Sequence, residues 1–140
     1  MAIKKEKFVS AGSILFYRGK IVLLFHHQKQ VFVLPKGRRK KGETLKQTAL
    51  RETREETGFQ NLRYARKLGQ HQYIFVQGNA KNFKTVHVYL VELLDKVKKP
   101  NTQMPNEKFS NRFFSYSEAM KKLKWEADRK LLRKAKEFIK

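Results

Sequence analysis

Residues 34–59, LPKGRRKKGETLKQTALRETREETGF, place a cluster of acidic side chains shortly after a cluster of basic ones. Within this stretch Thr44 and Gln47 have the spacing of a capping box, which marks the start of a helix. Gly58 stands where a helix ends in the left-handed conformation that glycine adopts without a steric penalty. The stretch therefore predicts a basic loop that leads into a helix between residues 44 and 58.

The three acids near the end of this helix are arranged in a way that stability alone does not favour. Glu52, Glu55 and Glu56 stand at i, i+3 and i+4 on one helix face, where like charges repel each other by roughly half a kcal/mol per pair. They also lie in the last turn, where the helix dipole disfavours negative charge. Hard divalent cations such as Mg²⁺ favour clustered carboxylate oxygens, so the pattern indicates a metal site. The alternative is a solvated helix face on which Arg51 and Arg54 pair with the acids.

The overall charge of the chain narrows the range of partners. The 140 residues contain 33 Lys and Arg against 12 Asp and Glu, which gives a formal net charge of +21. Such a charge favours polyanionic partners, namely phosphate-rich small molecules or RNA. Because the lysines are scattered along the whole chain, general charge repulsion between copies is an alternative interpretation. With 40% hydrophobic residues, the chain predicts one folded domain, residues 1–140.

The same composition argues against two other classes of protein. The sequence contains no run of about 18 apolar residues, which predicts no membrane partner. It has no cysteine, so neither a disulfide framework nor a thiolate metal site is open to it. We therefore expect a cytoplasmic protein, whose oligomeric state the sequence does not determine.

The segments around the helix predict strands before and after it. Alternating β-branched and aromatic residues, separated by turn signals, predict strands at 8–17, 19–27, 30–35, 62–77, 84–94 and 111–116. A hairpin turn is expected at residues 18–20. From Ser117 onward, apolar residues at helical spacing predict a helical tail that continues to the end of the chain. Strands on both sides of a central helix, with a second helix last, predict an α/β domain with a mixed sheet.

The spacing of the charged and glycine positions resembles a known family signature. Five residues separate Gly37 from Glu43, seven separate Glu43 from Arg51, and the segment RETREETGF completes the pattern. This is similar to the box of the Nudix hydrolases, G-x5-E-x7-R-E-U-x-E-E-x-G-U, in which U is a bulky apolar residue. Only Thr53 departs from it, and threonine is β-branched and can pack. The resemblance implies a single Nudix domain, its box at residues 37–59, and an α/β/α sandwich with a mixed central sheet.

The resemblance also implies roles for the residues of the box. The metal would be Mg²⁺, with Mn²⁺ as an alternative. Its ligands would be Gly37, through the carbonyl, together with Glu52, Glu55 and Glu56. Glu55 and Glu56 are the candidate catalytic carboxylates, and Glu43 and Arg51 would form a structural ion pair that holds the loop to the helix. The reaction implied is hydrolysis of a phosphoanhydride bond in a nucleoside diphosphate linked to another moiety.

Substrate-binding and further catalytic residues are expected outside the cluster of acids. The bases of the loop would draw in a polyphosphate and offset its charge once it is bound. The candidates for substrate contact are Lys36, Arg38, Arg39, Lys41, His87 and Tyr89. For His87 and Tyr89 the alternative is an ordinary place in the sheet or the core. Glu107, in the polar loop before the last strand, is a candidate catalytic carboxylate, with a solvated loop acid as the alternative.

The segments LPKG and ALRETREETG are similar to those of diadenosine tetraphosphate hydrolases, in which threonine occupies the apolar position of the box. This likeness implies a dinucleoside polyphosphate substrate. In that group an aromatic ring stacks on adenine. Here Val88 falls where the stacking tyrosine is expected, and Tyr89 is one place later, on the other face of a strand. Alternative substrates are diphosphoinositol polyphosphates and the 5′ cap or triphosphate of RNA, and a third hypothesis is a catalytically idle RNA-binding module.

Overall fold

The computed structural model describes residues 4–99 and 108–139, in which seven strands form one sheet. The strands are β1 (Lys4–Tyr17), β2 (Lys20–His26), β3 (Val31–Val33), β4 (Lys36–Arg38), β5 (Leu62–Gln77), β6 (Ala80–Leu93) and β7 (Phe109–Phe114). The helices are α1 (Leu45–Thr57), α2 (Tyr116–Lys122) and α3 (Glu126–Ala135), followed by a short 3-10 helix, η1 (Lys136–Phe138). None of these helices is long and apolar enough to cross a membrane.

The long strand β1 organises the sheet. The main path of paired strands is β3-β2-β1-β6-β5, with β4 paired to β1 and β7 paired to β2. β1 and β6 run parallel, whereas β1 pairs with β2 and β4 in the antiparallel sense, as do β2 with β3 and β7 and β5 with β6. Both directions therefore meet on β1, and the mixed sheet that the sequence predicts is confirmed.

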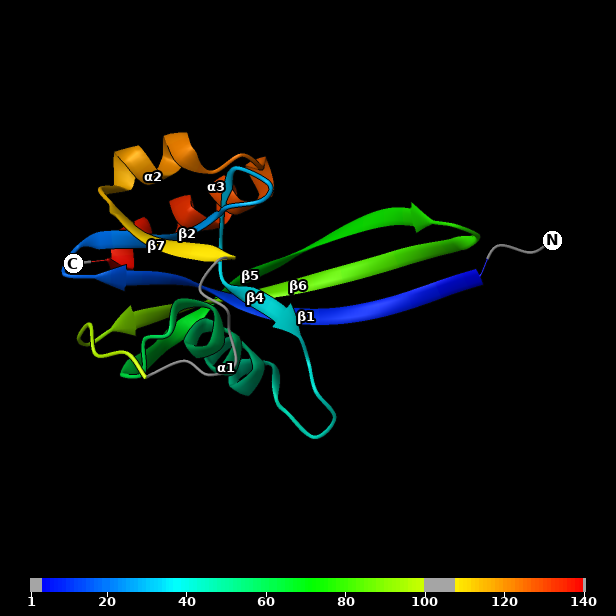
Figure 1. Ribbon diagram of the computed structural model, residues 1–140, viewed down its shortest axis with the longest axis horizontal. Helices are drawn as coiled ribbons and strands as arrows, with labels where there is room; N and C mark the ends of the chain where they lie inside the picture. Colours follow the sequence, from blue (N-terminus) through cyan, green and yellow to red (C-terminus); the bar gives the residue numbers. More distant parts are fainter. Residues whose placement is uncertain (1–3, 100–107, 140) are drawn as a thin grey trace.

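Helices cover both faces of this sheet (Figure 1). α2 and α3 lie on one face, where Leu132 belongs to the same buried cluster as Val86 and Val88 of β6. α1 lies on the other face, where Ala49 shares a second buried cluster with Val91 of β6. Successive residues of β6 thus serve opposite sides of the sheet, as the pleat of a strand requires. The expected α/β architecture, with helices on both sides of a mixed sheet, is confirmed.

Three strands continue beyond the helices as a projecting wing, made of residues 4–9 of β1, 72–77 of β5 and 80–85 of β6 (Figure 1). β1 begins at Lys4 rather than at residue 8, and β6 begins at Ala80 rather than at residue 84. These additional residues include several lysines and show little apolar alternation. Their strand structure comes from continuous pairing of β6 with β1 and β5, which the local sequence does not signal.

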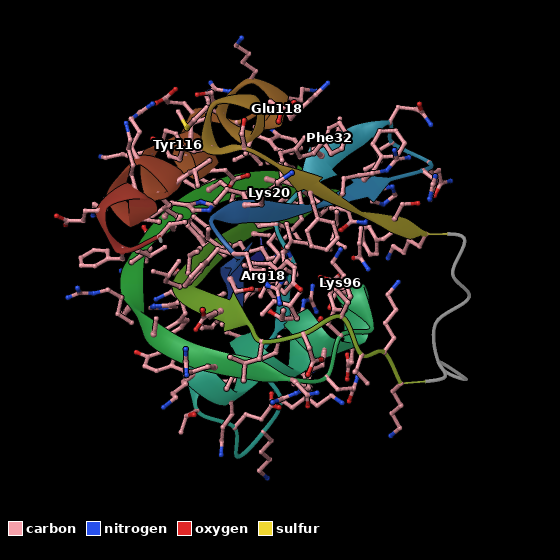
Figure 2. All side chains as sticks on the ribbon, turned by 90° about the vertical axis from the view of Figure 1, so that its left-hand side faces the viewer. Arg18, Lys20, Phe32, Lys96, Tyr116 and Glu118 are labelled. Atoms are coloured by element: carbon pink, nitrogen blue, oxygen red, sulfur yellow. The ribbon has the colours of Figure 1, made fainter. Side chains whose placement is uncertain are left out.

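The opposite end of the sheet carries the predicted hairpin between β1 and β2. Arg18 and Gly19 both have positive φ, as the two central residues of a type I′ turn require. Figure 2 shows Lys20 of this turn region beneath α2, with Tyr116 and Glu118 above it. The hydrogen bond that the Ser115 backbone N–H donates to Glu118 in a capping box is the largest cause that lowers the pKa of Glu118, and the Lys20 charge adds a smaller effect.

The helical tail differs from the expectation of one helix from Ser117. α2 ends at Lys122 and α3 begins at Glu126, and Leu123 between them has extended backbone angles. Leu123 is 1% exposed and forms a bridge with Phe32 of β3. Burial of this side chain against the sheet therefore breaks the helix into two, although the apolar spacing continues across the break.

Helix α1 follows the sequence closely. Thr44 caps it in a complete capping box with Gln47, and Gly58 ends it with a φ of 83°. Thr53, the one departure from the apolar pattern, is fully buried. Its hydroxyl lies 2.6 Å from the Ser13 hydroxyl of β1 and also donates to the Ala49 carbonyl. Threonine here joins α1 to the sheet by a buried polar contact in place of apolar packing.

This contact gives a test of the α1–β1 interface. Thr53→Val should lower the free energy of unfolding by about 1–3 kcal/mol, because the buried Ser13 hydroxyl loses its partner. Adding Ser13→Ala to Thr53→Val should recover part of the loss, since no unpaired hydroxyl remains. Urea denaturation of wild type, both single variants and the double variant measures the coupling. Strictly additive effects would show that the two hydroxyls do not stabilise each other.

Candidate active site

The centre of the candidate site is a close approach between β4 and α1. Gly37, in the middle of β4, pairs with Ala11 of β1. A Cβ atom added to Gly37 would lie 2.1 Å from Cδ of Glu52, which leaves no room for any side chain. The Glu52 carboxyl group therefore packs directly against the backbone of β4. Only glycine permits this contact, which explains the fixed glycine at the start of the motif.

Arg51 connects the loop to the helix. Its guanidinium donates to both carboxylate oxygens of Glu43, with Nε 2.6 Å from Oε2, and to the Arg38 carbonyl at 3.0 Å. It also contacts Glu52 at 2.7 Å and Glu55 at 3.2 Å. The hydrogen bond from Arg51 is the largest cause that lowers the pKa of Glu43 to about 2. The structural role of the Glu43–Arg51 pair remains a prediction, and this geometry supports it.

Glu56 is the acid that faces inward. Its Oε1 accepts a hydrogen bond of 2.7 Å from the backbone N–H of Lys36. The pKa of the Glu56 carboxyl is raised to about 8, mainly by burial, and the charge of Glu52 contributes to this rise. The Lys36 hydrogen bond and the charges of Lys108 and Lys36 act in the opposite direction. A carboxyl group in this position is costly to ionise unless a cation lies beside it.

The acids of α1 are of the type that binds divalent metals, but their side chains do not converge on one point. Among the described residues, no group of three or more His, Asp or Glu side chains converges closely enough to hold a metal ion. Arg51 draws the carboxylates of Glu52 and Glu55 to itself. Nevertheless, Glu52 and Glu56 are close enough to repel each other beside the Gly37 backbone. A hard cation would relieve this repulsion, so the oxygen donors fit such an ion.

A cavity of about 580 Å³ opens beside Glu56. Four lysines line it: Lys29, Lys36, Lys84 and Lys108. Three aromatic residues also line it: Tyr73, Phe109 and Trp125. The polar lining also includes His26, His71, Gln72 and the acid Asp128. The cavity thus combines cations, flat apolar surfaces and a buried carboxyl group, which together suit an anionic ligand with a planar part.

The predicted basic residues divide between the cavity and the loop. Lys36 lines the cavity, as the sequence suggested. The Arg38 guanidinium stacks 3.8 Å above the Phe8 ring, and its charge, after burial, helps to lower the pKa of Lys84 in the cavity wall. Arg39 and Lys41 are exposed in the loop and lie outside the lining of the cavity. Their predicted role in substrate binding is therefore limited to long-range attraction.

The position of Tyr89 corrects the expectation that it stacks on a base. Tyr89 is 7% exposed and belongs to the buried cluster on the α1 side, 5.8 Å from the Tyr64 ring. His87 lies on the same face of β6, where its Nδ1 accepts from Lys67 Nζ at 3.1 Å. Neither residue lines the cavity. The reason is strand alternation, because Lys84 and Val86 face the cavity side and the odd-numbered residues face α1.

The candidate catalytic carboxylate of the loop before β7, Glu107, lies outside the described residues. Glu92, at the end of β6, pairs with Arg63 of β5. The sequence did not single out the lysines at positions 29, 84 and 108, or the group formed by His71, Tyr73, Trp125 and Asp128. The only local signal for these residues was alternation along β5, which places His71 and Tyr73 on one face.

The family model of the NUDIX domain matches residues 7–135. The chain belongs to the Nudix family. The resemblance of its box to the family signature is therefore confirmed. Nudix hydrolases generally use divalent metals, which agrees with the oxygen donors on α1.

Among curated proteins, this Nudix chain is 48% identical over 61 residues to MutT4 of Mycobacterium tuberculosis, a protein named as a candidate mutator protein. That match covers 44% of this chain and 24% of the relative, so the matched segment spans about a quarter of the relative's length.

Solved structures share the fold at lower identity. An Ap4A hydrolase from C. elegans is 22% identical, with a TM-score of 0.69 over 94% of this chain and 96% of that one. A Nudix hydrolase from Listeria monocytogenes is 17% identical, with a TM-score of 0.74 over 91% of each chain. A Nudix hydrolase from Nitrosomonas europaea is 16% identical, with a TM-score of 0.69 over 96% of this chain and 92% of that one.

The contact of Gly37 with Glu52 predicts a sharp effect in this Nudix box. Gly37→Ala should displace the Glu52 carboxylate and lower the hydrolysis rate roughly a hundredfold, because such displacements disturb positioning. Gly42→Ala, in the same loop, is the matched control: its Cβ would meet nothing within 4 Å, although its φ of +84° costs some stability. Steady-state phosphate release measures both. Equal rates in the two variants would contradict the positioning role of Gly37.

The Glu43–Arg51 pair predicts a pH-dependent effect on stability. The pKa of Glu43 is about 2 in the folded protein, below its ordinary value of 4.5, so its contribution is complete above about 4.5 and is lost as the pH falls toward about 2. Glu43→Gln should therefore lower the melting temperature at neutral pH. The difference in melting temperature between Glu43→Gln and wild type should become smaller as the pH falls from about 4.5 toward about 2, which thermal melts at several pH values would measure. A constant difference would mean that the charge of Glu43 is not what stabilises the loop.

Proposed function

We propose that this Nudix hydrolase cleaves a phosphoanhydride bond of a dinucleoside polyphosphate, such as diadenosine tetraphosphate, with Mg²⁺ or alternatively Mn²⁺ as the metal. The observation that carries the proposal is the composition of the cavity beside Glu56. Four lysines and two exposed aromatic rings share one space with Glu56 of the box. Phosphates suit the lysines, and a base suits the rings.

The positions of the lysines support a phosphate chain near Glu56. The Nζ atoms of Lys36 and Lys84 lie 6.0 Å and 5.9 Å from the centre of the Tyr73 ring. The charges of Lys36 and Lys108 act on Glu56 strongly enough to oppose the rise of its pKa. A polyphosphate between these ammonium groups would therefore lie between Tyr73 and Glu56. Burial lowers the pKa of Lys84, because it disfavours the charged form of the side chain. An anionic ligand beside Lys84 would favour the charged form again.

The residues of the box supply the remaining functions. The carbonyl of Gly37 and the carboxylates of Glu52 and Glu56 would hold the metal beside the phosphates. The bound metal would polarise a phosphoryl oxygen and lower the pKa of the attacking water. Glu55, whose side chain is 39% exposed, keeps enough freedom to accept the proton from that water. Glu52 and Glu55 would exchange contacts with Arg51 for these roles.

The likeness to the Ap4A hydrolase of C. elegans agrees with this substrate, although at 22% identity it bears on the fold alone. The aromatic lining argues for a nucleoside over a diphosphoinositol polyphosphate, since the saturated ring of an inositol is not planar and offers no flat face for stacking.

A second candidate substrate, the 5′ end of RNA, is favoured by the wing. Tyr73 and Phe75 alternate on β5 with ring centres 6.1 Å apart, and they lead from the cavity onto the wing. Lys84 pairs with Tyr73 across the strands. Aromatic rings beside cations form a surface on which successive bases can stack. A single-stranded RNA whose 5′ phosphates lie at Glu56 could therefore continue along this face.

The catalytic assignment predicts the result of removing each acid. Glu52→Gln and Glu56→Gln should each lower the rate of hydrolysis by several orders of magnitude, because each removes a carboxylate from the metal site. Neither should unfold the protein, because burial opposes the ionisation of Glu56 and Arg51 keeps its pair with Glu43 when Glu52 loses its charge. Glu137→Gln, at an exposed position of η1, is the control and should keep wild-type rates. Near-normal turnover in either variant of the box would refute the site.

A product-resolved substrate panel tests the substrate class. Diadenosine tetraphosphate, a triphosphorylated RNA, a nucleotide sugar and a diphosphoinositol polyphosphate would be compared with Mg²⁺ and with Mn²⁺. The proposal expects the highest kcat/KM for the dinucleotide. A higher kcat/KM for triphosphorylated RNA would favour the second candidate. A kcat/KM for the inositol compound higher than for the dinucleotide and for the RNA would overturn the role given to the aromatic lining.

A further inference from the structure

Asp128 is a buried acid in the cavity wall that the family chemistry leaves without a role. It is 6% exposed, lies in the first turn of α3 and lines the cavity. Among the described residues no side chain or backbone group donates a hydrogen bond to its carboxyl group. The Nε2 atom of His71 lies 3.8 Å from its Oδ1. Because Asp128 lines the cavity, a ligand there could supply the donor that this carboxyl group lacks.

His71 does not neutralise this acid. Burial lowers the pKa of His71, which leaves the ring uncharged at neutral pH despite the opposing effect of Asp128. Burial also raises the pKa of Asp128, with the charges of Lys36 and His71 acting against it. The Nε2 atom of His71 has no hydrogen-bond partner among the described residues. Asp128 and His71 are thus two neighbouring polar groups that form no hydrogen bond with each other.

The surroundings of Asp128 are planar and aromatic. The ring of His71 stacks on Tyr73 at a centroid distance of 6.3 Å and an interplanar angle of 23°. Tyr73 is 39% exposed, and Trp125, directly before α3, is 46% exposed. Lys36 joins this aromatic group to Glu56, since its Nζ lies 6.0 Å from the centre of the Tyr73 ring and its backbone N–H donates to Glu56. The order along the cavity is therefore acid and rings, then Lys36, then the box.

This order matches the parts of a nucleotide. A base against Tyr73 would direct its edge toward Asp128 and its phosphates past Lys36 toward Glu56. The carboxyl oxygens of Asp128 can accept from an exocyclic amino group but would meet a ring carbonyl with repulsion. We propose that Asp128 is a specificity-determining residue of this hydrolase, which accepts a hydrogen bond from the exocyclic amino group of adenine or guanine and so discriminates against bases that lack it. The inference rests on the proposed nucleotide substrate.

Hypoxanthine provides the matched test, because it is a purine without an exocyclic amino group. Wild type should hydrolyse diadenosine or diguanosine tetraphosphate roughly tenfold to a hundredfold better in kcat/KM than diinosine tetraphosphate, the range expected for a hydrogen bond to a charged group. The difference should appear mainly in KM, since Asp128 lies away from the reacting phosphates. Equal values for the amino and inosine substrates would overturn the inference without any variant.

Asp128→Asn keeps the shape of the side chain and should abolish this preference. The asparagine amide can donate to the carbonyl of hypoxanthine, so kcat/KM should rise for the inosine substrate and fall for the amino substrates. Glu126→Gln, in the same turn of α3 but exposed and paired with Arg129 and Arg133, is the control and should keep the wild-type preference. Equal loss on all substrates in Asp128→Asn would show a structural role and contradict base recognition.

A binding experiment separates this inference from the proposed function. Trp125 is the only tryptophan of the chain and lines the cavity, so its fluorescence reports occupancy without turnover. ATP should quench it with a lower Kd than ITP in metal-free buffer, and Asp128→Asn should remove the difference. If no dinucleotide is hydrolysed but this preference is found, the proposed substrate fails and the base site stands. Equal Kd values for ATP and ITP in the wild type would overturn the base site itself.

Discussion

The contact between the Glu52 carboxyl group and the backbone at Gly37 is the constraint on which the site depends. It requires α1 to lie directly against β4, with no side chain between them. β4 in turn lies against β1, where a Cβ at Gly12 would come within 2.3 Å of the Pro35 carbonyl. Two glycines thus leave room for the Glu52 carboxyl group beside β4 and for the Pro35 carbonyl beside β1. As a consequence the N–H of Lys36 reaches Glu56, and the acids of a helix meet the cations of a loop.

The neighbouring bases and acids of the sequence do not simply neutralise each other. One base, Arg51, holds Glu43 and keeps two acids of α1 in place. Lys36 contributes its backbone to Glu56 and its ammonium group to the cavity. Arg39 and Lys41 remain in solvent, where their charge is screened within about 10 Å. The arrangement therefore separates charges that build the site from charges that attract a ligand, although the sequence places them in one run.

The sequence predicted the parts of the fold that depend on local signals. The limits of α1, the turn after β1 and the mixed sheet follow from caps, turn residues and alternation, and each is confirmed. The length of β1 and the break at Leu123 depend on residues that are distant in the chain, so no local sequence pattern predicts them. For Tyr89, strand alternation already indicates the face opposite Val88, and the structure shows Tyr89 packed beside Tyr64 in the buried cluster on the α1 side.

The cavity shows why a family box locates the chemistry but leaves substrate choice open. The acids of α1 are adjacent in sequence, and their spacing can be recognised in one chain. His71 belongs to β5 and Asp128 to α3, and they meet only because α3 packs on β5. Close packing at Gly69, where a Cβ would lie 3.0 Å from Leu131 of α3, sets the distance between these elements. The residues that distinguish one ligand from another therefore come from elements with no shared motif, and their burial and missing partners reveal them.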